Sequence, residues 1–293
     1  MGDIHFSNRD RGNPVPGVCR FKNNNKQAAG ASRRGCSSRS QRDVQDRTIG
    51  FGDVLSTKGI LHVHSRFSDG DESLERVIEV IESAGMRFAA VSDHAEVFDD
   101  RRMEEYVRAC EALSGSSFLV IPGLEFALKG GTIHILAYGI HQRVRYTTME
   151  ELVDGIHHAG GIAVLAHPPA GSINLIGSIK TKIDGIEVWN GRYDGTVAPR
   201  ADSFQLLRRI RSVNPKAAAF CGIDLHQIRQ ARKPIYMQVQ SERLERDSIL
   251  SALQSGRFTV HGNNTTIPAS GNLTFVQELS IAVKQPLCRP WAG

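Results

Sequence analysis

Two segments far apart in the chain each place a pair of metal-type ligands two residues apart. His62-x-His64 and Asp224-x-His226 both lie at the end of apolar, strand-like runs. Residues i and i+2 of a strand point to the same face, so each pair can aim two ligating atoms at one point. Imidazole and carboxylate groups are ligands used for Zn, Mn and Fe. The spacing therefore predicts a metal site assembled from separate strands.

Three further motifs between these pairs carry ligating residues. Asp93 and His94 end an apolar run, Glu125 follows a Pro-Gly pair, and His167 lies in Ala-His-Pro. The residue before a proline is biased towards extended geometry, which fixes the chain direction at His167. Asp93 is either a ligand itself or a neighbour that orients a ligand histidine. A carboxylate such as Glu125 can bridge two metals, which a single imidazole cannot.

Nine candidate ligands result, six histidines and three acids. Asp69, taken alone, also fits a turn residue before glycine, and His134 alone also fits a packed histidine. Nine ligands can serve three ions of four- or five-fold coordination, with water or substrate in the open positions. The candidates are His62, His64, Asp69, His94, Glu125, His134, His167, Asp224 and His226.

The elements that must position these groups alternate between apolar runs and amphipathic stretches. Strands are predicted at 59–65, 88–92, 118–121, 132–138, 162–166, 185–189 and 217–222, and helices at 73–85, 100–113, 148–159 and 198–212. A strand at 235–239, a helix at 242–255 and a strand at 258–261 follow. The alternation predicts parallel βαβ units, in which functional groups gather at the C-terminal ends of the strands. Every ligand motif falls at or just after such an end, apart from His134 at the start of a run.

The positive charge of the chain is concentrated in its first fifty residues. The whole chain carries +5, but residues 1–50 hold ten Lys/Arg and four Asp/Glu, which leaves 26 and 27 for the rest. The charge therefore does not predict that the folded domain binds nucleic acid. Residues 1–50 also lack apolar periodicity and are predicted to form a disordered basic tail. A basic arm for nucleic acid and a misassigned start codon are the alternatives. Residues 51–262 are predicted to form the single domain, and residues 263–293 a C-terminal extension without an assigned role.

Cysteine usage and hydropathy predict a cytoplasmic protein without a membrane partner. The chain has no apolar run of about 18 residues and no visible signal peptide. Its five cysteines are scattered and form no CxxC motif, which is typical of a reduced compartment. Cys221 lies near Asp224 in an apolar run, where packing as a small hydrophobic residue is favoured over metal ligation.

The ordered motifs resemble those of the PHP (polymerase and histidinol phosphatase) domain family. The series HxH, SDG, DH, GLE, H, AHP and DxH extends over about residues 58–262. The resemblance implies a distorted (β/α)7 barrel, which is TIM-like, and metal-dependent phosphoester hydrolysis with two to three Mn, Zn or Fe ions. The chain departs from the family pattern at Ile60, where many members have an acid, at Asp69, where some have histidine, and at Ile223, where serine is more usual.

The family pattern also implies three ligand groups. The first is His62, His64, Glu125 and Asp224; the second is Glu125, His134 and His167; the third is Asp69, His94 and His226. Glu125 would bridge the first two groups, and metal-bound water would supply hydroxide near neutral pH. Catalytic roles fall to Glu125, Asp224 and His226, and the sequence leaves open which residue is the general acid.

Phosphate-binding cations are expected near such a centre. Arg192 follows a predicted strand and is the first candidate, with Arg66 and Lys129 as weaker ones; each also fits an ordinary surface cation. Trp189 can stack on a substrate or pack in the core, and the sequence does not separate these roles.

These observations predict a free-standing hydrolase acting on phosphoric ester bonds. A small phosphomonoester, such as histidinol phosphate or a nucleotide, a short oligonucleotide and a phosphotyrosine protein are the substrates considered. The alternatives are a metal-dependent amide or ester hydrolase on the same barrel and a non-catalytic, metal-stabilised binding module. The oligomeric state is left open.

Overall fold

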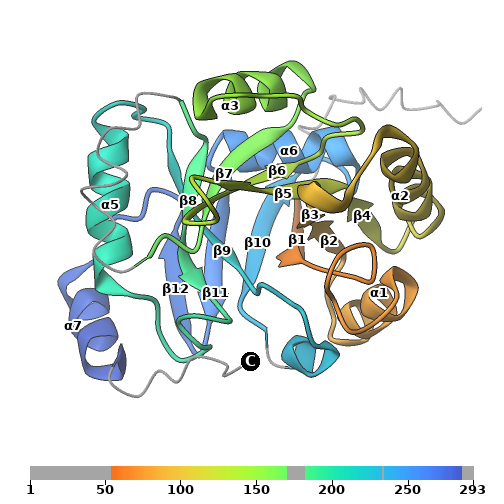
Figure 1. Cartoon of the computed structure of the whole chain (residues 1–293). Helices are drawn as coiled ribbons and strands as arrows, with labels where there is room; N and C mark the ends of the chain where they lie inside the picture. The colour runs from red at the N-terminus through yellow and green to blue at the C-terminus, as the bar shows by residue number, and fades with distance from the viewer. Residues whose placement is uncertain (1–53, 170–181, 233, 286–293) are drawn as a thin grey trace, which may run out of the picture. The chain divides into compact units, whose positions relative to one another are not determined.

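The computed structural model describes residues 54–169, 182–232 and 234–285. They form two six-stranded sheets with helices on their outer faces (Figure 1). The first sheet has the order β12-β11-β10-β1-β2-β4 and the second the order β3-β5-β6-β7-β8-β9. The strands of the first sheet are β1 (Leu55–Val63), β2 (Phe88–Val91), β4 (Leu119–Ile121), β10 (Tyr236–Ser241), β11 (Phe258–Gly262) and β12 (Thr265–Pro268). Those of the second are β3 (Asp93–His94), β5 (Gly123–Leu128), β6 (Ile133–Tyr138), β7 (Ile162–Ala166), β8 (Gly185–Asn190) and β9 (Ala218–Gly222).

Helices α1, α2, α3 and α7 begin at side chains that accept hydrogen bonds from their first amides. Ser73 accepts a hydrogen bond from the Arg76 amide, which confirms it as the N-cap predicted from sequence. Thr148 and Glu151 form a reciprocal capping box. Among the described residues, no helix has both the length and the apolar composition needed to cross a bilayer. The helices are α1 (Leu74–Ser83), α2 (Asp100–Ala112), α3 (Met149–His158), α5 (Ala201–Arg211), α6 (Arg246–Gln254) and α7 (Phe275–Lys284), with short 3₁₀ turns η1 (Ala95–Val97) and η2 (Ile228–Arg232).

The predicted run of parallel βαβ units is only partly correct. Strands β1, β2 and β4 are parallel, as are β7, β8 and β9. Strand β6 instead runs antiparallel to both β5 and β7. Strand β5 has no counterpart in the sequence prediction, and it joins β6 through a turn in which Lys129, Gly130 and Gly131 all have positive φ. So short a connection can join only antiparallel strands.

The C-terminal part of the described chain completes the first sheet. Strand β10 pairs antiparallel with β1, and β11 and β12 continue that pattern outward. Strand β12 and helix α7 belong to the predicted extension 263–293, of which the structure describes residues up to 285. The predicted tail, residues 1–50, lies outside the described residues.

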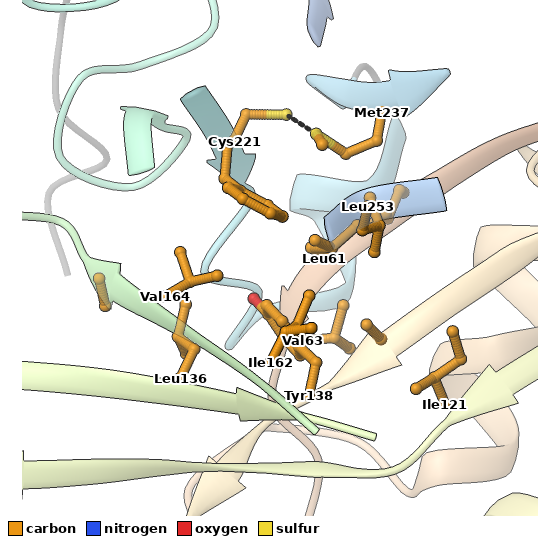
Figure 2. Packing of buried hydrophobic residues seen from close by; sticks show 14 of the residues in the cluster. Leu61, Val63, Ile121, Leu136, Tyr138, Ile162, Val164, Cys221, Met237 and Leu253 are labelled. Carbon is orange, nitrogen blue, oxygen red and sulfur yellow. Dashed lines mark hydrogen bonds between the residues drawn. The ribbon is translucent and has the colours of Figure 1, made fainter. Parts of the chain in front are cut away.

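The two sheets meet where β1 and β9 end. The amide of Ile223 donates to the Leu61 carbonyl, the amide of Leu225 donates to the His62 carbonyl, and the amide of His64 donates back to Leu225. Behind this junction, side chains from both sheets pack together, including Leu61, Met237, Leu136 and Cys221 (Figure 2). The described chain is therefore an α/β fold with mixed sheets, in which a shared core supports the junction.

Candidate metal centre

The nine predicted ligands come together at this junction. Each belongs to a group of at least three His, Asp or Glu side chains whose ligating atoms lie within 4.8 Å of one another. Most follow the C-terminal end of a strand, as the alternation of elements predicts. Glu125 and His134 are exceptions, because they are the third residue of β5 and the second residue of β6. Glu125 nevertheless lies only four residues after the end of β4. His134 lies at the start of β6. The antiparallel direction of β6 brings that start beside the ends of its neighbours.

The first group is built on an irregular strand end. The pairing of β1 with β2 shifts register between Leu61 and Val63, and His62 has a φ of 61°. A bulge of this kind re-aims a side chain, so the simple two-residue alternation does not describe the His62/His64 pair. The two rings nevertheless converge. Their Nε2 atoms each lie 3.2 Å from Glu125 Oε2 and 3.7 Å from Asp224 Oδ1.

These spacings are those of donor atoms arranged around one ion. Nitrogen and oxygen donors at about 2.0–2.1 Å from a tetrahedral Zn lie about 3.3 Å from one another. Both ring nitrogens of His64 are buried and have no hydrogen-bond partner among the described residues. Buried polar groups are normally hydrogen-bonded. His64 Nε2 lies 3.2 Å from Glu125 Oε2 without making a hydrogen bond to it, so an ion held by these four side chains would satisfy this nitrogen. The residues present therefore fit a divalent metal.

The second group shares Glu125 with the first. Glu125 Oε1 lies 2.6 Å from His134 Nδ1 and 3.0 Å from His167 Nε2. Its other oxygen, Oε2, faces the His62 and His64 rings. One buried carboxylate thus presents each of its two oxygens to a different pair of histidines.

The third group lies on the side open to solvent. Asp69 Oδ2 is 3.1 Å from His226 Nε2 and 3.6 Å from His94 Nε2, and Asp69 Oδ1 is 3.5 Å from His64 Nδ1. The Asp69 side chain is 51% exposed, whereas that of Glu125 is 1% exposed. This group can therefore exchange water and ligands more readily than the other two.

Backbone strain is concentrated at the same place. Six non-glycine residues among those described have positive φ, and His62, His167 and Asp224 are three of them. Left-handed geometry costs on the order of 1–3 kcal/mol for such residues and persists where the surroundings impose it, often at functional sites. The strain therefore marks the centre independently of its chemistry.

Opposite charges in the centre hold its acids ionised. Burial alone would raise the pKa of Glu125, but the attraction of His62 and hydrogen bonds from His134 and His167 hold it well below its ordinary value. The pKa of Asp69 is also lowered, against its burial, by hydrogen bonds from neighbouring histidines. Burial lowers the pKa of His226, but Asp224 and Asp69 outweigh it and raise the value to about 9. The carboxylates are therefore in the ionised form that metal ligation requires.

Glu187 is an important contact of the centre that the sequence prediction missed. It is buried on β8, and its Oε1 lies 2.8 Å from His62 Nδ1. Its Oε2 accepts hydrogen bonds from the His167 amide and from Asn190 Nδ2. A carboxylate that binds the far nitrogen of a ligand histidine fixes the orientation of that ring. The available signal was a lone acid in the apolar run of residues 185–189, because a buried carboxylate requires partners.

Asp93 supports the centre through a loop. It was predicted to ligate or to orient a ligand histidine, but its oxygens accept hydrogen bonds from the Ser65 amide, the Ser65 hydroxyl and the Ser68 hydroxyl. These bonds fix the turn that carries Asp69. The hydrogen bonds from Ser65 and Ser68 thus satisfy the buried Asp93 carboxylate, and none of these bonds involves a histidine ring.

The three predicted cations differ in their surroundings. Arg66 donates to the Asp71 carbonyl and lies 3.6 Å from Glu72, so its charge is already engaged. Lys129 lies exposed in the β5–β6 turn. Arg192 is half-buried in the segment after β8, where its amide donates to Asn190.

The aromatic residue at the mouth of the centre is Tyr193 rather than Trp189. Trp189 is fully buried and donates to the Gly195 carbonyl, which makes it a core residue. Tyr193 is 51% exposed, and its ring centroid lies 4.9 Å from that of His167. Cys221 is buried and lies 3.6 Å from the Met237 sulfur, so it packs as a core residue.

Among the solved structures that resemble this chain, one from Bacteroides vulgatus has a TM-score above 0.5 and supports the fold. A two-domain protein from Bacteroides vulgatus that contains a predicted PHP-like metal-dependent phosphoesterase is 18% identical, with 85% of this chain and 75% of that chain covered, at a TM-score of 0.55. An amidohydrolase from Chromobacterium violaceum, with bound sulfate and no metal, is 17% identical over 58% of this chain and 87% of its own, at a TM-score of 0.42. A lesion-specific endonuclease from Pyrococcus furiosus is 14% identical over 69% of this chain and 56% of its own, at a TM-score of 0.45.

No curated protein matches the chain. The PHP domain model matches residues 61–218, more than half of the chain, and this range contains seven of the nine converging side chains. The order and type of the ligands, their convergence and this match agree. The chain belongs to the PHP domain family.

Proposed function

We propose that this protein is a metal-dependent phosphoesterase that hydrolyses a small phosphomonoester or a short phosphodiester at a di- or trinuclear centre. The observation that carries the proposal is the position of Glu125, whose two oxygens face different histidine pairs. A carboxylate in this position is suited to bridge two ions. Two ions held close together can clamp both the attacking and the leaving oxygen of an in-line displacement at phosphorus.

The donor set limits the metals that the centre would hold. Its imidazole and carboxylate donors suit Zn, Mn and Fe, and the supply of each metal decides which one is bound. The first ion would be held by His62, His64, Glu125 and Asp224, the second by Glu125, His134 and His167, and the third by Asp69, His94 and His226. When bound, such ions would acidify water and neutralise charge on the phosphoryl oxygens.

His226 and Asp224 are placed to handle protons. His226 Nδ1 lies 3.1 Å from Asp224 Oδ1, and its Nε2 lies 3.1 Å from Asp69 Oδ2. Without metal, these acids favour the protonated form of the ring and raise its pKa to about 9. We propose that, in a dinuclear centre without the third ion, His226 holds or passes a proton at the solvent-facing side, where a leaving alkoxide needs one.

The substrate enters beside Arg192 and Tyr193 in this proposal. Burial and Asp224 raise the pKa of Tyr193, while Arg192 lowers it, so both charges act on the phenol. Arg192 precedes Tyr193 in the chain and is our candidate for attracting a phosphate, and the exposed Tyr193 ring offers a flat surface next to His167. Arg66 and Lys129 are weaker candidates, because Arg66 is engaged and Lys129 lies on a turn.

We also propose that the two sheets together form the distorted (β/α)7 barrel that the family resemblance implies. Strand β2 leads into β3 through the single residue Ser92, and β4 leads into β5 through the single residue Pro122. Each of these pairs then counts as one broken strand. The backbone hydrogen bonds between residues 61–64 and 223–225 join the two ends of the resulting order.

The proposed setting is the reduced cytoplasm, with a small phosphorylated molecule or a short oligonucleotide as the partner. The two described cysteines, Cys110 and Cys221, are buried free thiols, in agreement with such a setting.

The test combines metal analysis with phosphate release. The purified chain should contain two to three equivalents of Zn, Mn or Fe and should release phosphate from an aryl phosphate or a short oligonucleotide until a chelator is added. His167→Ala should remove turnover and leave a folded protein, because only a ligand is lost. His261→Ala, which removes a histidine that contacts Thr259 on the first sheet, is the matched control and should keep full activity. Bound metal with hydrolysis of amides or carboxylic esters in place of phosphoesters would overturn the proposal.

A further inference from the structure

A buried series of contacts joins a partly buried arginine to the metal centre. Arg200 Nε lies 2.6 Å from Asp194 Oδ1 in an ion pair. Asp194 Oδ2 accepts a hydrogen bond from the Asn190 amide at 2.8 Å. Asn190 Nδ2 in turn donates to Glu187 Oε2 at 2.9 Å and to Asp224 Oδ2 at 3.5 Å. Asp194, Asn190 and Glu187 are all buried, so the series is shielded from water.

Arg200 also reaches the ligand loop directly. Its Nη2 donates to the Pro168 carbonyl at 2.5 Å. The preceding residue, His167, has a φ of 22°, and its amide donates to Glu187 Oε2 at 2.8 Å. The backbone around His167 is therefore held on one side by Glu187 and on the other by Arg200. A strained backbone persists only when its surroundings fix it in this way.

The chemistry of the pair favours positioning over stability. Taking two charges out of water offsets most of their attraction, so a buried ion pair is weak evidence for stability. Arginine offers several donors in a rigid planar fork, which lets Arg200 contact a carboxylate and a carbonyl at once. Lysine has a compact ammonium and cannot reproduce that geometry.

We propose that Arg200 is a positioning residue of the metal centre, which acts through Asp194 and the Pro168 carbonyl to keep the His167 ring aimed at the second ligand group. The proposal rests on the metal centre of the proposed function. It assigns to Arg200 no contact with substrate or metal.

The test measures metal affinity, so that it does not depend on turnover. Zn would be titrated into the full, metal-stripped chain in competition with a chelating indicator. Arg200→Ala should weaken the binding of one equivalent by about 10–100-fold, the usual effect of losing a group that orients a ligand, and leave the remaining equivalents unchanged. Added guanidinium ion should restore part of the loss, and Arg200→Lys should be intermediate.

Arg211→Ala is the matched control. Arg211 is also partly buried and donates to a backbone carbonyl, that of Ser270, but it contacts no part of the centre. It should leave every Zn affinity unchanged. Asp194→Asn should reproduce a smaller version of the Arg200→Ala effect, which keeps the test valid if Arg200→Ala does not fold. Thermal unfolding in chelator would show which variants are folded.

The outcomes separate this proposal from the proposed function. Wild-type affinities in Arg200→Ala, or an equal loss in Arg211→Ala, would overturn the positioning role. Zn binding by the wild type without any phosphoester hydrolysis would overturn the proposed function alone, and a selective loss in Arg200→Ala would still support positioning. A wild type that binds no Zn would overturn both.

Discussion

Histidines are grouped with acids at two places in this fold, the metal centre and the His157–Asp184 pair at α3, and the two groupings differ in how the protein satisfies the rings. At the metal centre, His64 has no hydrogen-bond partner for either ring nitrogen among the described residues, and His62 has a left-handed backbone. On α3, His157 Nε2 contacts Asp184 Oδ2 at 2.8 Å, and the same oxygen accepts the Ala163 amide. The second grouping is satisfied by the protein itself. Residue type alone therefore does not identify a metal site; convergence, strain and unpaired atoms do.

The sharpest test of this contrast is Glu125→Gln. The amide has nearly the shape of the carboxylate but carries no charge and cannot bridge two cations in the same way. We expect phosphate release to fall to the level of the metal-free protein, as measured with an aryl phosphate under metal-saturated conditions. Asp184→Asn is the parallel change at the α3 pair and should leave turnover intact; an equal loss there would mean that the two groupings do not differ.

A second test displaces a support of the centre without changing any charge. A Cβ at Gly222 would lie 1.7 Å from Glu187 Oε1 and 2.6 Å from His62 Cβ. Gly222→Ala should therefore move Glu187 and weaken metal binding by about 10–100-fold. Titration with Zn would measure this effect. Gly115→Ala is the control, since its added methyl meets nothing within 4 Å; unchanged affinity in Gly222→Ala would contradict the role given to Glu187.

Metal removal should separate the two regions thermodynamically. An ion that binds only the folded state stabilises it by about 2.7 kcal/mol when its free concentration is 100 times Kd. We expect a chelator to lower the wild-type Tm by several degrees and to have a smaller effect on His64→Ala. The chelator should have its full effect on His157→Gln, since His157 and Asp184 belong to none of the converging groups among the described residues. Calorimetry or fluorescence would follow the unfolding.

The smallest effect is the pH dependence of the α3 pair. The hydrogen bond that His157 donates to Asp184 raises the pKa of His157 against the effect of burial. A raised folded-state pKa stabilises the protein below the unfolded value of about 6.5, and the contribution is lost as pH rises through the folded value. In chelator, the Tm difference between wild type and His157→Gln should be largest at mildly acidic pH and shrink as pH rises. A Tm difference that grows with pH would contradict a raised pKa of His157 in the folded state.

The sequence predicts the converging histidines and acids because metal chemistry restricts residue type and strand ends restrict their position. His62, Glu125 and Asp224 were found in this way. Strand β5 was missed because a short hairpin reads much like a loop in an alternating pattern. Because β5 was missed, the antiparallel direction of β6 was missed too. That direction explains why His134, at the start of β6, lies beside the other ligand residues.

Side chains that support the ligands carry a weaker sequence signal. Glu187 contacts His62, 125 residues away in the chain, and Arg200 contacts Pro168, 32 residues away, and no short motif marks either contact. Tyr193 lies four residues after Trp189, and only burial distinguishes the exposed ring from the packed one. Such roles depend on tertiary contacts, which short motifs do not encode.

The central claim is that Glu125 bridges two ions, and electron paramagnetic resonance of the Mn-loaded protein tests it most directly. The account predicts the multiline spectrum of a spin-coupled Mn pair in the wild type, and its replacement by the six-line spectrum of isolated Mn in Glu125→Gln. A wild type that binds two or more equivalents of Mn but gives only the isolated-ion spectrum would contradict it.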